Sequence, residues 1–189
     1  AYMFEVRWHG RGGQGAWTAS NLLAISALKE GKYTQSFPTF GPERMGAPIM
    51  AFTRVSDEPI EIHCGIYNPD AVIVLDPTLL RSVPVLEGLK EGGLIIANYR
   101  GTPEELAETL GIKGKGYQVY VVPATDIAVE ILGRGITNTA MLGALVKATG
   151  IVKLESIYEA LKERFPGKIA ELNVKVVEKS YKETRGKKL

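Results

Sequence analysis

Four glycines lie within six residues near the amino terminus, where backbone N–H groups could meet an anion. The run follows an apolar stretch and consists of Gly10, Arg11, Gly12, Gly13, Gln14 and Gly15. Three of its glycines have the spacing G-x-G-x-x-G, a pattern that in doubly wound proteins sets amides and a helix end against a phosphate. The alternative is a tight turn that lets a helix pack on a strand, and this motif alone favours neither.

The residues around this turn argue against a nicotinamide dinucleotide. Folds that bind dinucleotides carry Asp or Glu at the end of the second strand, where the carboxylate binds the ribose hydroxyls. Here the second expected strand, residues 33–37, ends without a carboxylate, and the next one is Glu43. Arg11 and Gln14 are also larger than the small residues of a pyrophosphate turn. We therefore expect a phosphate or carboxylate at the turn rather than NAD.

A second candidate is the loop PTFGPERMGAP at residues 38–48. Three prolines fix φ in this loop and two glycines free it, so it should hold Glu43 and Arg44 in defined positions. Loops of this length usually have a function, although charges in water on a surface loop are the alternative. Because the loop follows the second strand, we expect it at the same sheet edge as the glycine turn.

A third candidate is the segment GITNTAMLGALVKATG at residues 135–150. Thr137 or Asn138 can cap a helix whose early face is small, with Gly143 at its centre. Such a face permits close approach by another helix or by a ligand. Taken alone, the segment favours a capped helix that is tightly packed.

The pattern of apolar residues predicts strands that alternate with helices. Strands are expected at residues 3–8, 33–37, 49–56, 59–64, 71–76, 94–99 and 117–124, and helices at 16–32, 78–90, 103–110, 125–132, 138–149, 154–164 and 168–183. This order predicts an α/β, Rossmann-like domain with a mostly parallel sheet and a helical C-terminal third. Residues 49–56 and 59–64 are expected to form a β-hairpin. We expect a single domain over residues 1–189, with a frayed tail at 184–189.

Composition excludes several classes of protein. A net charge of +2 does not favour nucleic acid as a partner, and no apolar run reaches the roughly 18 residues of a membrane helix. No signal peptide is evident, so the cytoplasm is the expected location. The single cysteine, Cys64, excludes an internal disulfide and a cysteine-ligated iron–sulfur cluster; we expect it to be buried and inert.

The chemistry expected of a free-standing enzyme is missing from the sequence. It has no metal-binding motif, no thiamine diphosphate motif and no activated nucleophile, and His9 and His63 are its only histidines. His9 lies next to the glycine turn and is expected to satisfy a local hydrogen bond. The combination of an anion-binding edge with no reactive group predicts a subunit that contributes to an active site shared with other chains.

Four blocks, in order, resemble the gamma subunit of 2-oxoacid:ferredoxin oxidoreductases, most closely the pyruvate and 2-ketoisovalerate enzymes. The blocks are GRGGQG at 10–15, SFPTFGPERMGAP at 36–48, NPDAVIVLD at 68–76 and ITNTAMLGALVKATG at 136–150. The resemblance implies a subunit of an enzyme that oxidatively decarboxylates a 2-oxoacid with coenzyme A, giving acyl-CoA, CO2 and reduced ferredoxin. It implies alpha, beta and delta partner subunits, thiamine diphosphate between alpha and beta, iron–sulfur (4Fe–4S) clusters in partner subunits, and ferredoxin as electron acceptor.

The resemblance also implies which residues of this chain meet coenzyme A at a shared cleft. These are Gly10, Arg11, Gly12, Gly13, Gln14 and Gly15, together with Phe40, Gly41, Pro42, Glu43, Arg44, Thr137 and Asn138, which would face the cleft or a neighbouring subunit. Some relatives read R-G-G where this chain has Arg44-Met45-Gly46, so the loop motif is only partly kept. Coenzyme A needs N–H donors or arginines for its phosphates, which suits the glycine turn with Arg11 or Arg44.

Three alternatives remain open at the level of sequence. The chain could be an independent NAD(P)-binding oxidoreductase domain. It could be a purely structural subunit that touches no ligand. It could also belong to the related indolepyruvate branch, with the same chemistry on an aromatic oxoacid.

Overall fold

The structure is a computed structural model that describes residues 2–39 and 45–189. Its described strands form one mixed sheet in the order β2-β3-β1-β4-β5-β6-β7. The strands are β1 (Met3–Arg11), β2 (Tyr33–Pro38), β3 (Pro48–Ser56), β4 (Ala71–Val74), β5 (Leu94–Asn98), β6 (Gln118–Val122) and β7 (Arg185–Lys188). The helices are α1 (Ala16–Lys29), α2 (Leu79–Ser82), α3 (Pro103–Leu110), α4 (Ala124–Leu132), α5 (Asn138–Thr149), α6 (Leu154–Arg164) and α7 (Gly167–Glu183).

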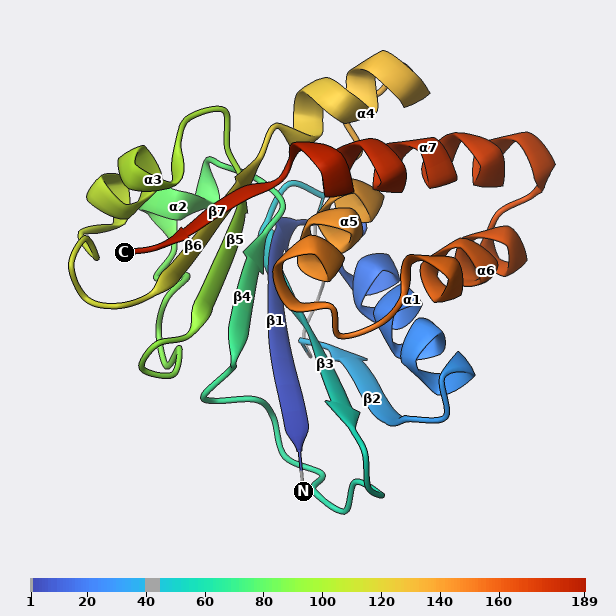
Figure 1. The fold of residues 1–189 in the computed structure, drawn as a ribbon, viewed down its shortest axis with the longest axis horizontal. Helices are drawn as coiled ribbons and strands as arrows, with labels where there is room; N and C mark the ends of the chain where they lie inside the picture. Colours follow the sequence, from blue (N-terminus) through green and yellow to red (C-terminus); the bar gives the residue numbers. More distant parts are fainter. Residues whose placement is uncertain (1, 40–44) are drawn as a thin grey trace.

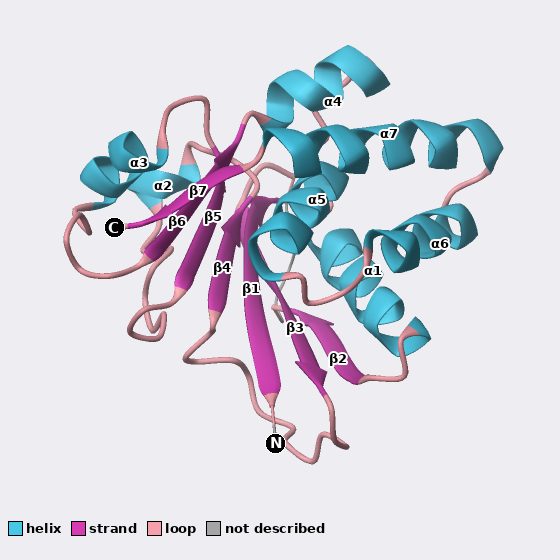
Figure 2. Ribbon diagram, viewed as in Figure 1, coloured by secondary structure: helices cyan, strands magenta, loops and turns pink. Residues whose placement is uncertain are grey.

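The α/β fold predicted from the sequence is confirmed, with a parallel core of β1, β4, β5 and β6. Strands β4 and β5 are buried along their whole length, as expected for apolar strands covered on both faces. Helices α1, α5, α6 and α7 pack on one face around Trp8, while α2 and α3 pack on the other face over β4, β5 and β6. Figures 1 and 2 show these helices on the two sides of the twisted sheet.

The predicted hairpin between residues 49–56 and 59–64 is wrong. Residues 59–64 form no strand, and β3 instead lies between β1 and β2, antiparallel to both. Since β1 and β2 occupy both edges of β3, no edge is left for a third partner. The antiparallel hairpin is therefore β2–β3.

The frayed tail expected at residues 184–189 is also wrong. Arg185–Lys188 forms β7, which pairs antiparallel with β6 at the end of the sheet (Figure 1). Leu189 adds two backbone hydrogen bonds, from its N–H to the Tyr117 carbonyl at 2.8 Å and from the Gly116 N–H to its own carbonyl at 2.7 Å. Gly186 permits the pairing, since a Cβ there would lie 2.1 Å from the Tyr120 ring.

Helix α3 begins where the sequence predicts, at a capping box. The Thr102 hydroxyl accepts a hydrogen bond from the Glu105 N–H, and the Glu105 carboxylate accepts one from the Thr102 N–H, each at 3.1 Å. Thr102→Ala should therefore lower the free energy of unfolding by about 1 kcal/mol. Urea titration checks this against Thr109→Ala, an exposed position in the same helix; equal stability of the two variants would rule out the cap.

Candidate functional site

The candidate site lies at the carboxyl edge of the parallel strands. The glycine turn follows β1, Asp76 and Thr78 follow β4, Asn98 ends β5, and Thr125 follows β6. Parallel strands present their carboxyl ends at one edge, which is where doubly wound sheets bind ligands. The sequence placed the glycine turn here but missed the polar residues that follow the other strands. A polar residue directly after each buried apolar run was the available signal.

Glycines at two positions of the turn are required by its backbone and by close neighbours. Gly13 and Gly15 have φ of 91° and 80°, in the region that favours glycine. A Cβ at Gly13 would lie 2.4 Å from the sulfur of Met45, and one at Gly15 would lie 2.5 Å from Nδ2 of Asn138. Gly10 differs, since it lies within β1 and a Cβ there would have ordinary contacts at 3.4 Å.

Arg11 is held in place beside the turn by three groups. Its Nη2 donates to Oγ1 of Thr78 at 2.9 Å, its Nη1 donates to the Gly46 carbonyl at 3.1 Å, and its Nε lies 3.4 Å from Oδ2 of Asp76. Gln14 donates from Nε2 to the same Asp76 oxygen at 2.7 Å and accepts from the Arg11 N–H at 2.7 Å. The turn and the end of β4 are thus joined by one polar network.

Asp76 is the acidic centre of this network. Partial burial alone would raise the pKa of Asp76, but hydrogen bonds from Thr78 and Gln14 and the charge of Arg11 outweigh it, so the pKa lies below its ordinary value. The carboxylate is therefore ionised at neutral pH and neutralises Arg11. An anion arriving at the turn must share Arg11 with Asp76.

The amino terminus of α1 offers a second source of positive potential. Its N-cap is Gly15, and no side-chain hydrogen bond caps it among the described residues. The first amides of a helix have no partner within the helix and carry the positive end of its dipole. The turn therefore combines helix amides that no described side chain caps with a fixed guanidinium.

Thr137 and Asn138 are brought to the same edge, although both are buried. Thr137 donates to the Leu75 carbonyl at 3.1 Å, and the Asn138 side chain touches Gly15 and accepts from the Thr139 N–H at 2.9 Å. These contacts attach the start of α5 to the end of β4 and to the glycine turn. They assign both residues a positioning role in the chain as it stands.

Five of the residues predicted from the sequence, Phe40, Gly41, Pro42, Glu43 and Arg44, lie outside the described part of the chain. The loop does return to the turn where it is described. Gly12 donates to the Ala47 carbonyl at 2.8 Å and accepts from the Gly46 N–H at 3.1 Å. The expectation that this loop meets the glycine turn is therefore confirmed for its last residues.

A hollow of about 390 Å³ opens beside this network, at the ends of β5 and β6. Asn98 anchors its floor by donating to the Leu75 carbonyl at 3.0 Å and to Oγ1 of Thr125 at 2.8 Å. Arg100 and Asp126 form a two-fold ion pair on its rim, at 2.6 and 3.0 Å. The carboxyl edge therefore has room for a ligand at the ends of β5 and β6, in a hollow that no residue of the glycine turn lines.

The remaining chemistry-bearing residues do not join the site. His9 is buried and accepts a hydrogen bond on Nε2 from Nε of Arg7 at 2.8 Å, as a local hydrogen bond was expected for it. Cys64 is exposed, which corrects the expectation of a buried thiol. Among residues 2–39 and 45–189, no group of three His, Cys, Asp or Glu side chains could hold a metal ion, and no helix is long and apolar enough to cross a membrane.

Comparison with known proteins decides the family. The model of the pyruvate ferredoxin/flavodoxin oxidoreductase family matches residues 5–183. This chain belongs to that family. A pyruvate/ketoisovalerate oxidoreductase common subunit gamma from Thermococcus kodakarensis is 57% identical over 96% of this chain and 97% of its own. A pyruvate synthase subunit PorC from Methanocaldococcus jannaschii is 49% identical, again over 96% and 97% of the two chains.

A solved structure gives the same answer for the fold. Pyruvate oxidoreductase subunit PORC from Thermotoga maritima superposes with a TM-score of 0.87 and 42% identity, over 98% of this chain and 99% of that one. The resemblance to gamma subunits drawn from the four sequence blocks is thus confirmed.

Proposed function

We propose that this chain is the gamma subunit of an enzyme that oxidatively decarboxylates pyruvate or a branched-chain 2-oxoacid. The products are an acyl-CoA, CO2 and reduced ferredoxin, and this chain lines the coenzyme A side of a cleft shared with its partners. Similarity over nearly the full length to a common subunit gamma of pyruvate/ketoisovalerate oxidoreductases, at 57% identity, and to a pyruvate oxidoreductase subunit PORC, at 42%, supports the assignment. The observation that supports coenzyme A binding is the amino terminus of α1, which no described side chain caps, beside the fixed Arg11.

Partner chains must supply the reactive groups of this enzyme. One cysteine cannot ligate an iron–sulfur cluster, and the sequence has no thiamine diphosphate motif. We assign thiamine diphosphate to alpha and beta subunits and the clusters to partner subunits that include delta. When bound there, thiamine supplies the carbanion chemistry of decarboxylation and the clusters carry electrons to ferredoxin.

This chain's role is to bind and orient the anionic end of coenzyme A. Because Gly12, Gly13 and Gly15 carry no side chains, the turn lets a phosphate approach the first amides of α1, where the helix dipole favours negative charge. Arg11 adds a charge-assisted hydrogen bond, and its bonds to Thr78 and Gly46 fix the direction of the guanidinium. Asp76 keeps Arg11 in position until the anion arrives.

Arg11→Ala should raise the KM for coenzyme A about tenfold in the assembled enzyme, with little change in kcat. A charge-assisted hydrogen bond to a bound phosphate is worth about 1.5–3 kcal/mol, and it is made before and during the reaction alike. Steady-state kinetics with varied coenzyme A measures this. The matched control is Arg81→Ala, an exposed arginine on nearby α2. An unchanged KM in intact Arg11→Ala enzyme would refute the role.

A purely structural role is the second candidate, because Arg11 also joins the glycine turn to Thr78 and Asp76 at the end of β4. On that view the Arg11–Asp76 network only joins the turn to β4. Arg11→Ala would then lower stability or assembly and leave the KM for coenzyme A unchanged. The same kinetic series therefore separates the two functions.

A further inference from the structure

We propose that the face of β2 and β3 turned away from α1 is a docking site for an extended segment of a partner subunit. The segment carries an apolar side chain flanked by Lys or Arg. This inference rests on the proposed membership of a multi-subunit enzyme, but not on coenzyme A binding. It concerns the opposite sheet face from the main helical layer, away from the carboxyl-edge network.

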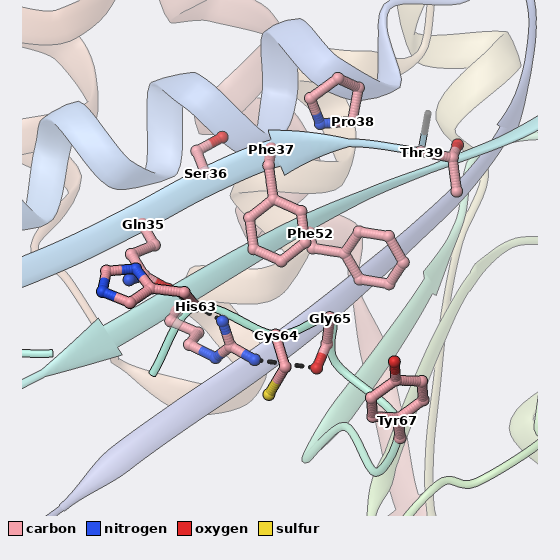
Figure 3. A pocket seen from close by; sticks show the side chains of 11 residues that line it. Gln35, Ser36, Phe37, Pro38, Thr39, Phe52, His63, Cys64, Gly65 and Tyr67 are labelled. Atoms are coloured by element: carbon pink, nitrogen blue, oxygen red, sulfur yellow. Dashed lines mark hydrogen bonds between the residues drawn. The ribbon is translucent and has the colours of Figure 1, made fainter. Parts of the chain in front are cut away.

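The direction of the side chains defines this face. Ser36 of β2 and Thr53 of β3 hydrogen bond to Ser20 of α1, at 2.9 and 2.6 Å. Because side chains alternate along a strand, Phe37 and Phe52 point to the other side. Their rings stack there with centroids 5.1 Å apart (Figure 3).

Within residues 2–39 and 45–189, the cover of this face is incomplete. Helices α2 and α3 pack over β4, β5 and β6, whereas the segment that follows β3 passes over β2 and β3 and leaves a groove of about 540 Å³. Figure 3 shows Tyr67, His63 and Cys64 at the groove with the two phenylalanines. Tyr67 is 74% exposed. Antiparallel strands such as β2 and β3 can leave one face to water, but this face carries two stacked phenylalanines beside the exposed Tyr67, an apolar surface that a partner segment would cover.

The guanidinium of Arg54, at the floor of the groove, is held by hydrogen bonds and its charge is neutralised by Glu5. Arg54 is 1% exposed and donates to Oε2 of Glu5 at 2.7 Å, to Oε1 of Gln35 at 2.8 Å and to the Gly65 carbonyl at 3.0 Å. Its guanidinium also lies 5.6 Å from the centre of the Phe37 ring. Since the charge of Arg54 is balanced by Glu5, the floor favours an apolar side chain over an anion.

The negative charge near the groove favours Lys or Arg on either side of the apolar side chain that would bind there. The sequence from residue 55 to residue 80 contains no Lys or Arg. The part of it that leads to the groove carries Asp57, Glu58 and Glu61, all exposed. Glu61 lies two residues before His63, which lines the groove. An acidic segment that leads into an apolar groove is complementary to an apolar anchor with positive neighbours.

Cys64 provides the direct test, because it is the only cysteine of the chain and lines the groove. The isolated chain and the complete co-expressed complex are each treated with a maleimide. Mass spectrometry then follows the modification of the peptide that contains Cys64 in each sample. We expect modification at least tenfold slower in the complex. A benzophenone maleimide at Cys64 should cross-link to a partner segment with Lys or Arg beside an apolar residue. Equal rates, or a cross-link only to an acidic segment, would overturn the proposal.

A charge reversal tests the acidic segment independently. Glu61→Lys should weaken binding of the chain to its partner subunits about tenfold, measured as a dissociation constant at low salt. Glu159→Lys makes the same change at an exposed position on α6 and should stay within twofold of wild type. Identical constants for the two variants would contradict docking at the groove. The KM for coenzyme A in assembled Glu61→Lys enzyme should be unchanged. The Glu61 test can therefore reject docking at the groove without rejecting coenzyme A binding, and the Arg11 test can do the reverse.

Discussion

Gly143→Ala is expected to lower the free energy of unfolding by about 2–3 kcal/mol, because α5 and α7 cross at this residue. A Cβ at Gly143 would lie 2.1 Å from Oγ of Ser180 and 2.6 Å from the Val177 carbonyl oxygen. The hydroxyl can rotate, but the carbonyl belongs to the backbone of α7. One methyl group therefore forces the two helices apart along a buried contact.

Urea unfolding of the purified chain measures this effect. The control is Gly167→Ala at the start of α7, where a Cβ would meet nothing within 4 Å. There the alanine should be neutral or slightly stabilising, since alanine is the better helix former. Equal stability of the two variants would show that the crossing relaxes without cost.

Acidification is expected to destabilise the chain through His9. Burial, and then the neighbouring charge of Arg7, lower the pKa of His9 from 6.5 to about 3. Between pH 6.5 and pH 3, His9 is protonated in the unfolded chain but not in the folded chain. The contribution of His9 to stability is thus complete above pH 6.5 and is lost as the pH falls toward 3, by up to about 1.4 kcal/mol per pH unit.

The test is the slope of stability against pH, compared between wild type and His9→Gln. Glutamine keeps an acceptor for Nε of Arg7 but takes up no proton, so the variant should lose less stability between pH 6 and pH 4. His63→Gln is the control at an exposed histidine and should follow wild type. Parallel curves for wild type and His9→Gln would mean that His9 is protonated without cost in the fold.

Local signals in the sequence determined most of the elements. Helices α3, α5 and α6 have the predicted bounds, 103–110, 138–149 and 154–164. The glycine turn could be placed at the sheet edge for the same reason. Periodicity, caps and turns depend only on residues a few positions apart, so they can be recognised from the sequence alone.

The tertiary structure alone decided which distant residues meet. It gave β3 two neighbours, made a strand of the tail, and showed that the small face around Gly143 receives a helix, not a ligand. It also joined Arg11 to Asp76 and Thr78, and left the aromatic face of β2 and β3 with a groove. Contacts between distant residues depend on which strand edges and charged groups already have partners in the folded chain. A local sequence pattern contains no information about those partners.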